Sequence, residues 1–107
     1  AKDMIISGGF NIYPSDLEAE LMKEAGVIEA AVVGVPSRAW GETPVGFVVL
    51  REGARDPATI MAAVNARLGK TQRLAAVHMI DEMPRSHIGK LLKTDLREEA
   101  VRRGGIA

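Results

Sequence analysis

Residues 84–90, with the sequence PRSHIGK, place a lysine directly behind a glycine. Pro84 fixes its own φ and donates no backbone hydrogen bond, whereas Gly89 allows a turn and a close approach to another surface. The segment is therefore predicted to be a shaped loop. Lys90 at its end is a compact positive charge on a flexible stem, which suits phosphate oxygens. The alternative is a solvated surface lysine, the usual state of this residue type.

The other residues that could bind a ligand give little support for a metal site or for a nucleotide-binding loop. His78 and His87 lack the spaced partners that a zinc site requires, so no metal site is expected. The sequence also contains no glycine-rich phosphate loop.

Composition excludes several classes of protein. A chain of 107 residues is expected to form one small domain that buries roughly 65% of its unfolded surface. Fourteen basic residues balance 14 acidic ones, which argues against nucleic acid as a partner, and no apolar run is long enough to span a membrane. The absence of cysteine excludes disulfides and fits a reducing compartment, so a cytoplasmic location is expected.

The elements that must position these residues alternate between short strands and helices. Strands are predicted at residues 4–6, 11–13, 27–35, 45–50 and 77–80. Helices are predicted from a capping box at residues 15–18 to near Gly26, from the cap at Asp56 to Gly69, and after Lys90. The last helix is expected to bury Leu92, Leu96 and Val101 and to expose its charged residues, Lys93 among them.

These elements predict an α+β domain over residues 1–107. It is expected to contain a small, mostly antiparallel three-stranded sheet packed with helices, plus an N-terminal two-stranded β-ribbon. The ribbon would turn at Gly8 and Gly9, where glycine permits a backbone conformation that most residues avoid.

Three stretches occur in a characteristic order: residues 2–18 (KDMIISGGFNIYPSDLE), 29–42 (EAAVVGVPSRAWGE) and 81–97 (DEMPRSHIGKLLKTDLR). Together they resemble the C-terminal domain of the adenylate-forming, or AMP-binding, superfamily. That superfamily includes acyl-CoA synthetases, the adenylation domains of peptide synthetases, and luciferases. The resemblance covers nearly the whole chain and is strongest to the acyl-CoA synthetases.

The resemblance implies a two-step reaction between this domain and a large N-terminal AMP-binding domain. A carboxylic acid attacks the α-phosphate of ATP, supplied with Mg²⁺, and coenzyme A then displaces AMP after this domain rotates. Lys90 matches the lysine of the first step, where its charge would stabilise shifting negative charge. Lys2 matches the hinge position, about which the domain would turn.

Four other positions match parts of the family that receive coenzyme A. Gly8 and Gly9 match glycines that line the pantetheine tunnel, although a hairpin turn alone would also require glycine. Trp40 matches an aromatic residue that contacts the nucleotide of coenzyme A, and core packing is the alternative. Arg73 matches a position that contacts a coenzyme A phosphate in some members, but its neighbours depart from the family pattern.

Several expectations follow for the intact protein. The chain begins at Ala1 inside the hinge motif, so we expect a domain from a larger enzyme that binds no cofactor and is inactive by itself. An acyl-CoA synthetase is favoured over a peptide-synthetase adenylation domain because no carrier sequence follows Arg103 and because residues 5–14 look like the fatty or aryl acid branch. A non-enzymatic binding module is the other alternative. The context of Lys90 also implies a lysine acetyltransferase as a partner.

Overall fold

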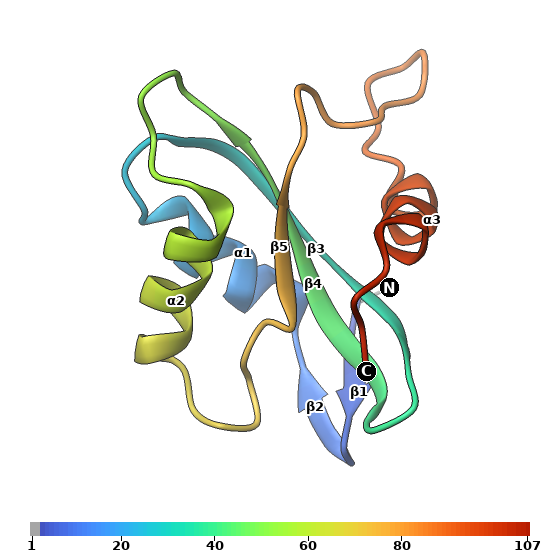
Figure 1. Cartoon of the computed structure of the whole chain (residues 1–107). Helices are drawn as coiled ribbons and strands as arrows, with labels where there is room; N and C mark the ends of the chain where they lie inside the picture. Colours follow the sequence, from blue (N-terminus) through green and yellow to red (C-terminus); the bar gives the residue numbers. More distant parts are fainter. Residues whose placement is uncertain (1–2) are drawn as a thin grey trace.

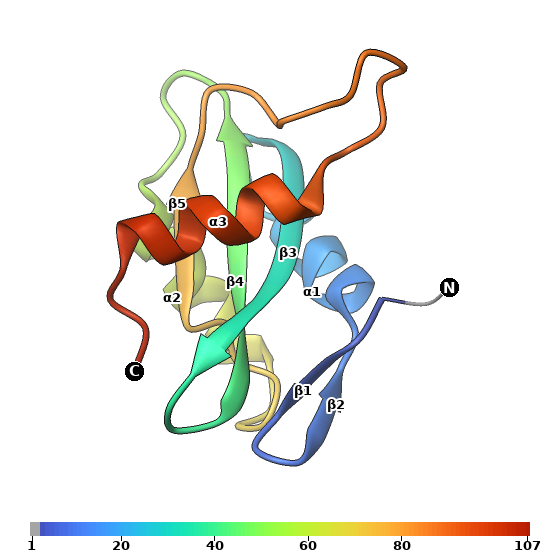
Figure 2. The same ribbon diagram turned by 90° about the vertical axis from the view of Figure 1, so that its right-hand side faces the viewer.

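The computed structural model describes residues 3–107 and confirms the predicted α+β fold (Figure 1). Its elements, in chain order, are β1 (Ile5–Ser7), β2 (Phe10–Ile12), α1 (Pro14–Met22), β3 (Val27–Ser37), β4 (Gly41–Leu50), α2 (Pro57–Arg67), β5 (Ala76–Met79) and α3 (Lys93–Arg103). Helices α1 and α2 lie on one side of the sheet, and α3 lies across the strands on the other side (Figures 1 and 2).

Strand β4 is the centre of the sheet because it pairs with three other strands. It runs antiparallel to β3 along its whole length and parallel to β5. At its first residue, Gly41 pairs with Ser7 of β1, and β1 pairs in turn with β2. The predicted three-stranded sheet and β-ribbon are therefore joined into one five-stranded sheet, with β3 at one edge.

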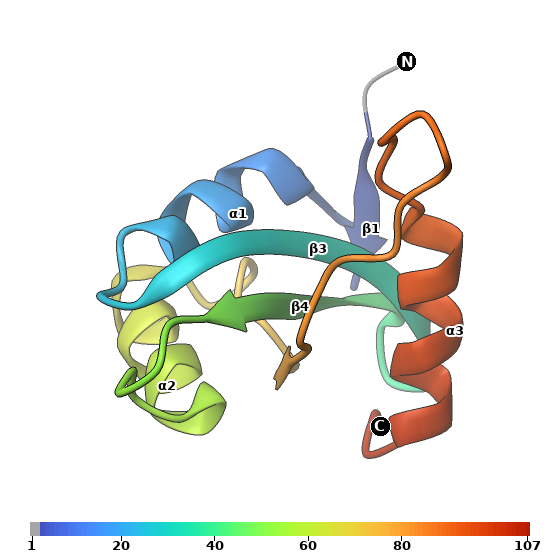
Figure 3. The same ribbon diagram turned by 90° about the horizontal axis from the view of Figure 1, so that it is seen from above.

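The alternation of side chains along β3 and β4 produces a core on each face of the sheet. Val32 and Val48 face α1 and α2, whereas Val33 and Phe47 face α3. Seen from above, the helices therefore cover both faces of the long strands (Figure 3). Burial of each large side chain contributes roughly 2 kcal/mol to folding, and these layers fix where the connecting loops leave the sheet.

Helix α2 begins as the sequence predicts. The Asp56 carboxylate accepts a 2.7 Å hydrogen bond from the Thr59 N–H, and Pro57 occupies the first turn, where its missing N–H costs nothing. The predicted capping box of α1 is wrong. The N-cap is Tyr13 without a side-chain cap bond, because Pro14 fits the first turn of the helix and shifts its start ahead of Ser15.

Helix α3 also departs from the prediction. Its buried residues are Leu96 and Ala100, whereas Val101 is 61% exposed. The helix starts at Lys93, and Leu96 and Ala100 lie one turn apart on the face that meets the sheet. A small alanine fits closely against the strands there, so the larger Val101 points to solvent.

Candidate functional site

The predicted lysine loop is a hairpin between β5 and α3, formed by residues 84–92 and called the lysine hairpin below. Arg85 and Leu91 form an isolated antiparallel bridge, and the Leu92 N–H donates to the Pro84 carbonyl over 2.9 Å. The two arms of the hairpin therefore hold each other by backbone contacts.

A glycine turn forms the tip of the lysine hairpin. The Gly89 N–H donates to the Ser86 carbonyl at 2.8 Å, and the Ser86 N–H donates to the Lys90 carbonyl at 2.9 Å. Gly89 has φ +85°, a conformation that residues with a Cβ rarely adopt. This pattern is that of a short hairpin loop closed by a glycine, and it places Lys90 directly after the turn.

The Lys90 side chain is exposed and forms no ion pair or side-chain hydrogen bond with the described part of the chain. It borders a hollow of about 450 Å³ that is also lined by Lys93 and Arg97. An unpaired ammonium at such an edge can approach a negatively charged group on another surface. The arrangement suits electrostatic stabilisation rather than proton transfer.

Lys93, predicted to lie on the solvent side of its helix, instead forms an ion-pair network. Its ammonium lies 2.8 Å from a carboxylate oxygen of Asp3 and 3.1 Å from one of Glu18. The same Glu18 oxygen accepts the Val32 N–H of β3 at 2.9 Å. The network therefore ties the start of the described chain to α1, β3 and α3. The predicted hinge residue, Lys2, lies outside the described residues.

The β1–β2 turn packs against the turn between β3 and β4. The Gly8 N–H donates to the Trp40 carbonyl at 2.8 Å, and a Cβ on Gly8 would lie 2.8 Å from the indole Cε3. Gly8 therefore has both a turn conformation and a packing reason to lack a side chain. A Cβ on Gly9 would meet nothing within 4 Å, so Gly9 borders open space.

Trp40 is 57% exposed, so the core-packing alternative for this residue is wrong. Together with Arg73 it lines a hollow of about 410 Å³ beside the β-ribbon. Lys70 and Thr71 line the same hollow, and the sequence signal for them was the polar, basic run after α2. An exposed indole beside two cations offers a surface on which a flat base can stack near anionic groups.

The segment that carries Arg73 is fixed by a side chain of α2. The Asn65 amide donates to the Leu74 carbonyl and its oxygen accepts the Leu74 N–H, each at 2.9 Å. Leu74 is itself buried in the core. The Asn65 side chain thus makes the two backbone hydrogen bonds that a neighbouring strand would otherwise make with Leu74. These bonds hold the wall of the hollow in place.

The structure brings together Gly8, Gly9, Trp40 and Arg73 but leaves Lys90 apart from them. Figures 1 and 2 show the loop after β5 at one end of the molecule and the β1–β2 and β3–β4 turns at the other. The candidate residues therefore form two separate groups at opposite ends of the domain.

Other kinds of site find no support in the described chain. Within residues 3–107 no three metal-ligating side chains come together. His78 lies on β5, and His87 is exposed in the lysine hairpin. No helix within the same residues combines the length and the apolar character needed to cross a membrane.

Comparison with known proteins gives matches along nearly the whole chain. Residues 16–90 match the AMP-binding enzyme C-terminal domain family. A 2-succinylbenzoate–CoA ligase of Geobacillus kaustophilus is 43% identical over 96 residues, which are 89% of this chain and 20% of that protein. The chain thus spans about a fifth of the length of the curated relatives that it matches.

Solved structures give the same result. ATP-bound MatB from Rhodopseudomonas palustris superposes with a TM-score of 0.85 at 38% identity, over 92% of this chain and 20% of that one. The amide bond synthetase McbA from Marinactinospora thermotolerans superposes with a TM-score of 0.83 at 33% identity, again over 92% of this chain and 20% of that one.

Proposed function

Because the chain belongs to the AMP-binding enzyme C-terminal domain family, which is part of the adenylate-forming enzymes, we propose that it is the mobile C-terminal domain of an acyl-CoA synthetase. The enzyme activates a carboxylic acid with ATP to an acyl-adenylate and then transfers the acyl group to coenzyme A. The separation of Lys90 from the group around Trp40 carries this proposal, since a domain that turns between two half-reactions can present a different end of its surface in each.

In the first step the Lys90 ammonium approaches the acid and the α-phosphate between the two domains. As the acid oxygen bonds to phosphorus and the bond to pyrophosphate breaks, negative charge moves onto the leaving group. A fixed positive charge lowers the energy of that transition state without taking a proton. The Lys90 side chain suits this role because it has no competing partner within the described chain.

In the second step the domain turns about Lys2 and presents its other end. Open space beside Gly9 leaves room for the thin pantetheine chain to reach the acyl-adenylate. The exposed Trp40 indole stacks on the adenine of coenzyme A, and Arg73 meets a phosphate of the same molecule. Thiol attack at the acyl carbon then releases AMP.

Several properties of the whole enzyme follow from this assignment. ATP enters as its magnesium complex, and most of its contacts belong to the N-terminal domain, which is the main partner of this chain. Acetylation of Lys90 by a lysine acetyltransferase would remove the charge that the first step requires. A cytoplasmic location also remains a prediction.

The likeness to an amide bond synthetase supports a second candidate function, in which an amine replaces coenzyme A as the acyl acceptor. The adenylation step and the role of Lys90 would be the same in both. The exposed indole beside Arg73 favours coenzyme A, since a simple amine has no flat base and no phosphate to occupy that hollow.

The test is to assay the two-domain enzyme that carries this chain with a panel of carboxylic acids and ATP. Pyrophosphate release is expected with an acid alone, and AMP release with thioester formation is expected when coenzyme A is added. A parallel reaction supplies an amine in place of coenzyme A, and amide formation there, with no thioester formed when coenzyme A is added, would identify the second candidate. The chain without its N-terminal domain should release no pyrophosphate. Acid-dependent release by this chain alone would contradict the two-domain proposal.

A further inference from the structure

The peptide bond that leads into Lys90 is held from both sides by side chains. Its oxygen, the Gly89 carbonyl, accepts a hydrogen bond from Nη1 of Arg85 at 3.1 Å. Its N–H, on Lys90, donates to Oγ of Ser86 at 3.2 Å. A peptide plane held at both its oxygen and its nitrogen cannot rotate freely, so the position of the Lys90 Cα, from which the side chain leaves, is restricted.

The Arg85 guanidinium connects this peptide bond to the sheet. Its other terminal nitrogen, Nη2, lies 2.5 Å from a carboxylate oxygen of Glu29 on β3. Glu29 is 56 positions away in the sequence and belongs to the long edge strand, which is part of the rigid core. A guanidinium can make both contacts at once because its donors form a rigid planar fork.

We propose that Arg85 is a positioning residue for adenylation, which holds Lys90 at its working angle by bridging the Gly89 carbonyl to Glu29. Arg85 does this through the backbone of Lys90 and does not touch the reacting atoms. Glu29 is the anchor of the bridge and also neutralises the charge of Arg85 beside the second cation of the hairpin. The inference rests on the proposed function of Lys90.

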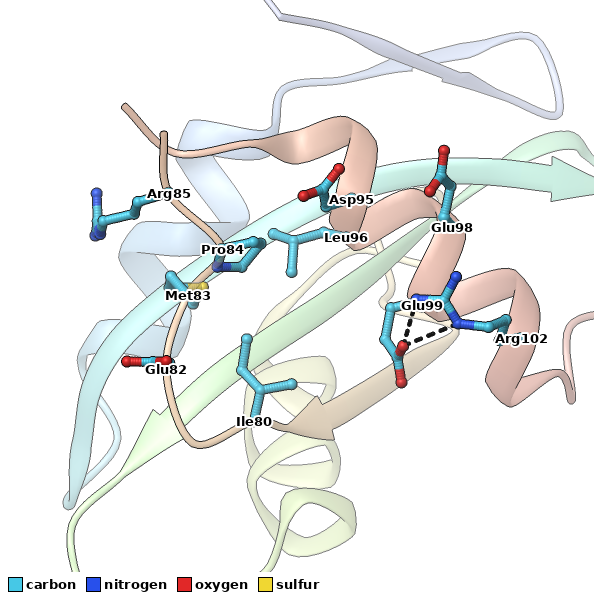
Figure 4. A pocket seen from close by; sticks show the side chains of 10 residues that line it. All are labelled: Ile80, Glu82, Met83, Pro84, Arg85, Asp95, Leu96, Glu98, Glu99 and Arg102. Carbon is cyan, nitrogen blue, oxygen red and sulfur yellow. Dashed lines mark hydrogen bonds and ion pairs between the residues drawn. The ribbon is translucent and has the colours of Figure 1, made fainter. Parts of the chain in front are cut away.

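The surroundings of Arg85 separate it from the other arginine of the same hollow. The hollow, of about 800 Å³, lies between residues 80–85 and α3, with Arg85 and Arg102 at its opposite ends (Figure 4). Arg102 pairs with Glu99 of its own helix at 2.7 Å and forms no hydrogen bond or ion pair with the hairpin. Arg102→Ala is therefore a matched control that removes a guanidinium from the hollow and leaves the Lys90 peptide bond untouched.

The experiment compares Arg85→Ala, Lys90→Ala and the double variant in the two-domain enzyme. Arg85→Ala should lower kcat for pyrophosphate release by about 10-fold, since small misplacement of a catalytic group is costly, and leave KM for the acid unchanged. Thioester formation from supplied acyl-adenylate should continue at its normal rate. In the Lys90→Ala background the added Arg85→Ala change should have no further effect, because there is no ammonium left to position.

Two results would overturn the proposal. If the effects of the two single variants multiply in the double variant, Arg85 acts independently of Lys90. If Arg102→Ala slows adenylation as much as Arg85→Ala does, the loss reflects the charge of the hollow and not the bridge.

Backbone hydrogen exchange tests the role of Arg85 independently of the proposed function of Lys90. Amides of residues 86–90 should exchange faster in Arg85→Ala and in Glu29→Gln than in the parent enzyme or in Arg102→Ala. Unchanged exchange in Arg85→Ala would overturn the positioning role whatever Lys90 does. If exchange rises but Lys90→Ala adenylates at the parent rate, the bridge exists and the proposed role of Lys90 has failed.

Discussion

The lysine hairpin and the opposite end of the domain, called the ribbon end and comprising Gly8, Gly9, Trp40 and Arg73, are held in place by different means. The hairpin leaves the sheet and is held mainly by backbone hydrogen bonds between its own arms and by the exposed contacts of Arg85, with Leu91 partly buried against the core. The ribbon end is built on continuous strand pairing and on close packing of the indole against glycine.

The difference shows how one small domain can present two kinds of surface. The hairpin presents a positive charge, and the effect of that charge on a reaction depends on where the side chain points. Polar contacts at the surface can orient a side chain without a large core behind it. The ribbon end presents a shape, with an open turn and an exposed ring, and shape requires rigid packing behind it. We therefore expect substitutions at the hairpin to alter a rate and substitutions at the ribbon end to alter access and binding.

The largest effect expected is that of Lys90→Ala in the two-domain enzyme. Adenylate formation should fall by about 100-fold or more, the scale of losing one well-placed electrostatic contact in a site that excludes water. Thioester formation from supplied acyl-adenylate should survive. Single-turnover measurement of each half-reaction is the check, with the exposed Arg55→Ala as a control. Equal loss in both half-reactions would show that Lys90 does not act in adenylation alone, and the proposed difference between the two ends would be wrong.

A leucine at Gly9 should show the opposite pattern. The leucine side chain would fill the open space beside the β-ribbon. Thioester formation should slow by a factor of several tens, which is less than the roughly 100-fold loss that misplacing a reactant can cause. Adenylation should be spared. Gly53→Leu is a matched control, because Gly53 has φ +84° against +83° for Gly9 and also meets nothing within 4 Å of a built Cβ. Equal effects of the two changes would indicate backbone strain alone.

Removal of the indole should have a smaller effect that is confined to binding. Trp40→Ala should raise KM for coenzyme A by about 10-fold, since stacking of a base on an aromatic ring contributes about 1–3 kcal/mol. The rate of adenylation should not change. Met79→Ala, which removes another half-exposed apolar side chain far from the ribbon end, provides the control. An unchanged KM for coenzyme A would remove Trp40 from the binding surface.

The smallest effect expected is a pH-dependent change in the stability of the whole domain, which affects both ends because one sheet joins them. Burial, with a further contribution from the charge of Arg103, lowers the pKa of His78 on β5. The folded chain therefore favours neutral His78, so this contribution to stability is complete above an unfolded pKa of about 6.5 and is lost as pH falls below it.

His78→Gln should accordingly flatten the decline in the urea midpoint between about pH 7 and pH 5. The carboxyl pKa of Glu20 is lowered by hydrogen bonds from Lys23 and then Arg67, and it affects stability only at more acidic pH. The exposed His87→Gln is the control. An undiminished decline in His78→Gln would show that His78 does not set this dependence.

Features that depend on neighbouring residues could be read from the sequence. Asp56 followed by Pro57 predicts the start of α2, because cap and first-turn preferences act within one helical turn. The turn at Gly8 was predicted because the conformation of a glycine in a tight turn also depends only on neighbouring residues. Ser15 misled the prediction of α1 because both a capping box and a first-turn proline were present, and the proline determined where the helix starts.

Contacts between distant residues could not be read in this way. Lys93 and Asp3 are 90 positions apart, and Arg85 and Glu29 are 56 apart, so no local pattern marks either pair. The sequence named Lys90 as the candidate charge, but the support behind it depends on how β3 passes beneath the hairpin. Long-range ion pairs of this kind follow from the fold and cannot precede it.

The contact between Glu18 and β3 also bears on aggregation. Strand β3 is long, rich in valine and lies at an edge of the sheet, which is the kind of strand that recruits a second chain by pairing. Glu18 occupies the outward N–H of Val32 and places a carboxylate and the Lys93 ammonium against that edge. The ion pairs that hold Asp3, the first residue of the described chain, therefore also block a place where a neighbouring molecule could add a strand.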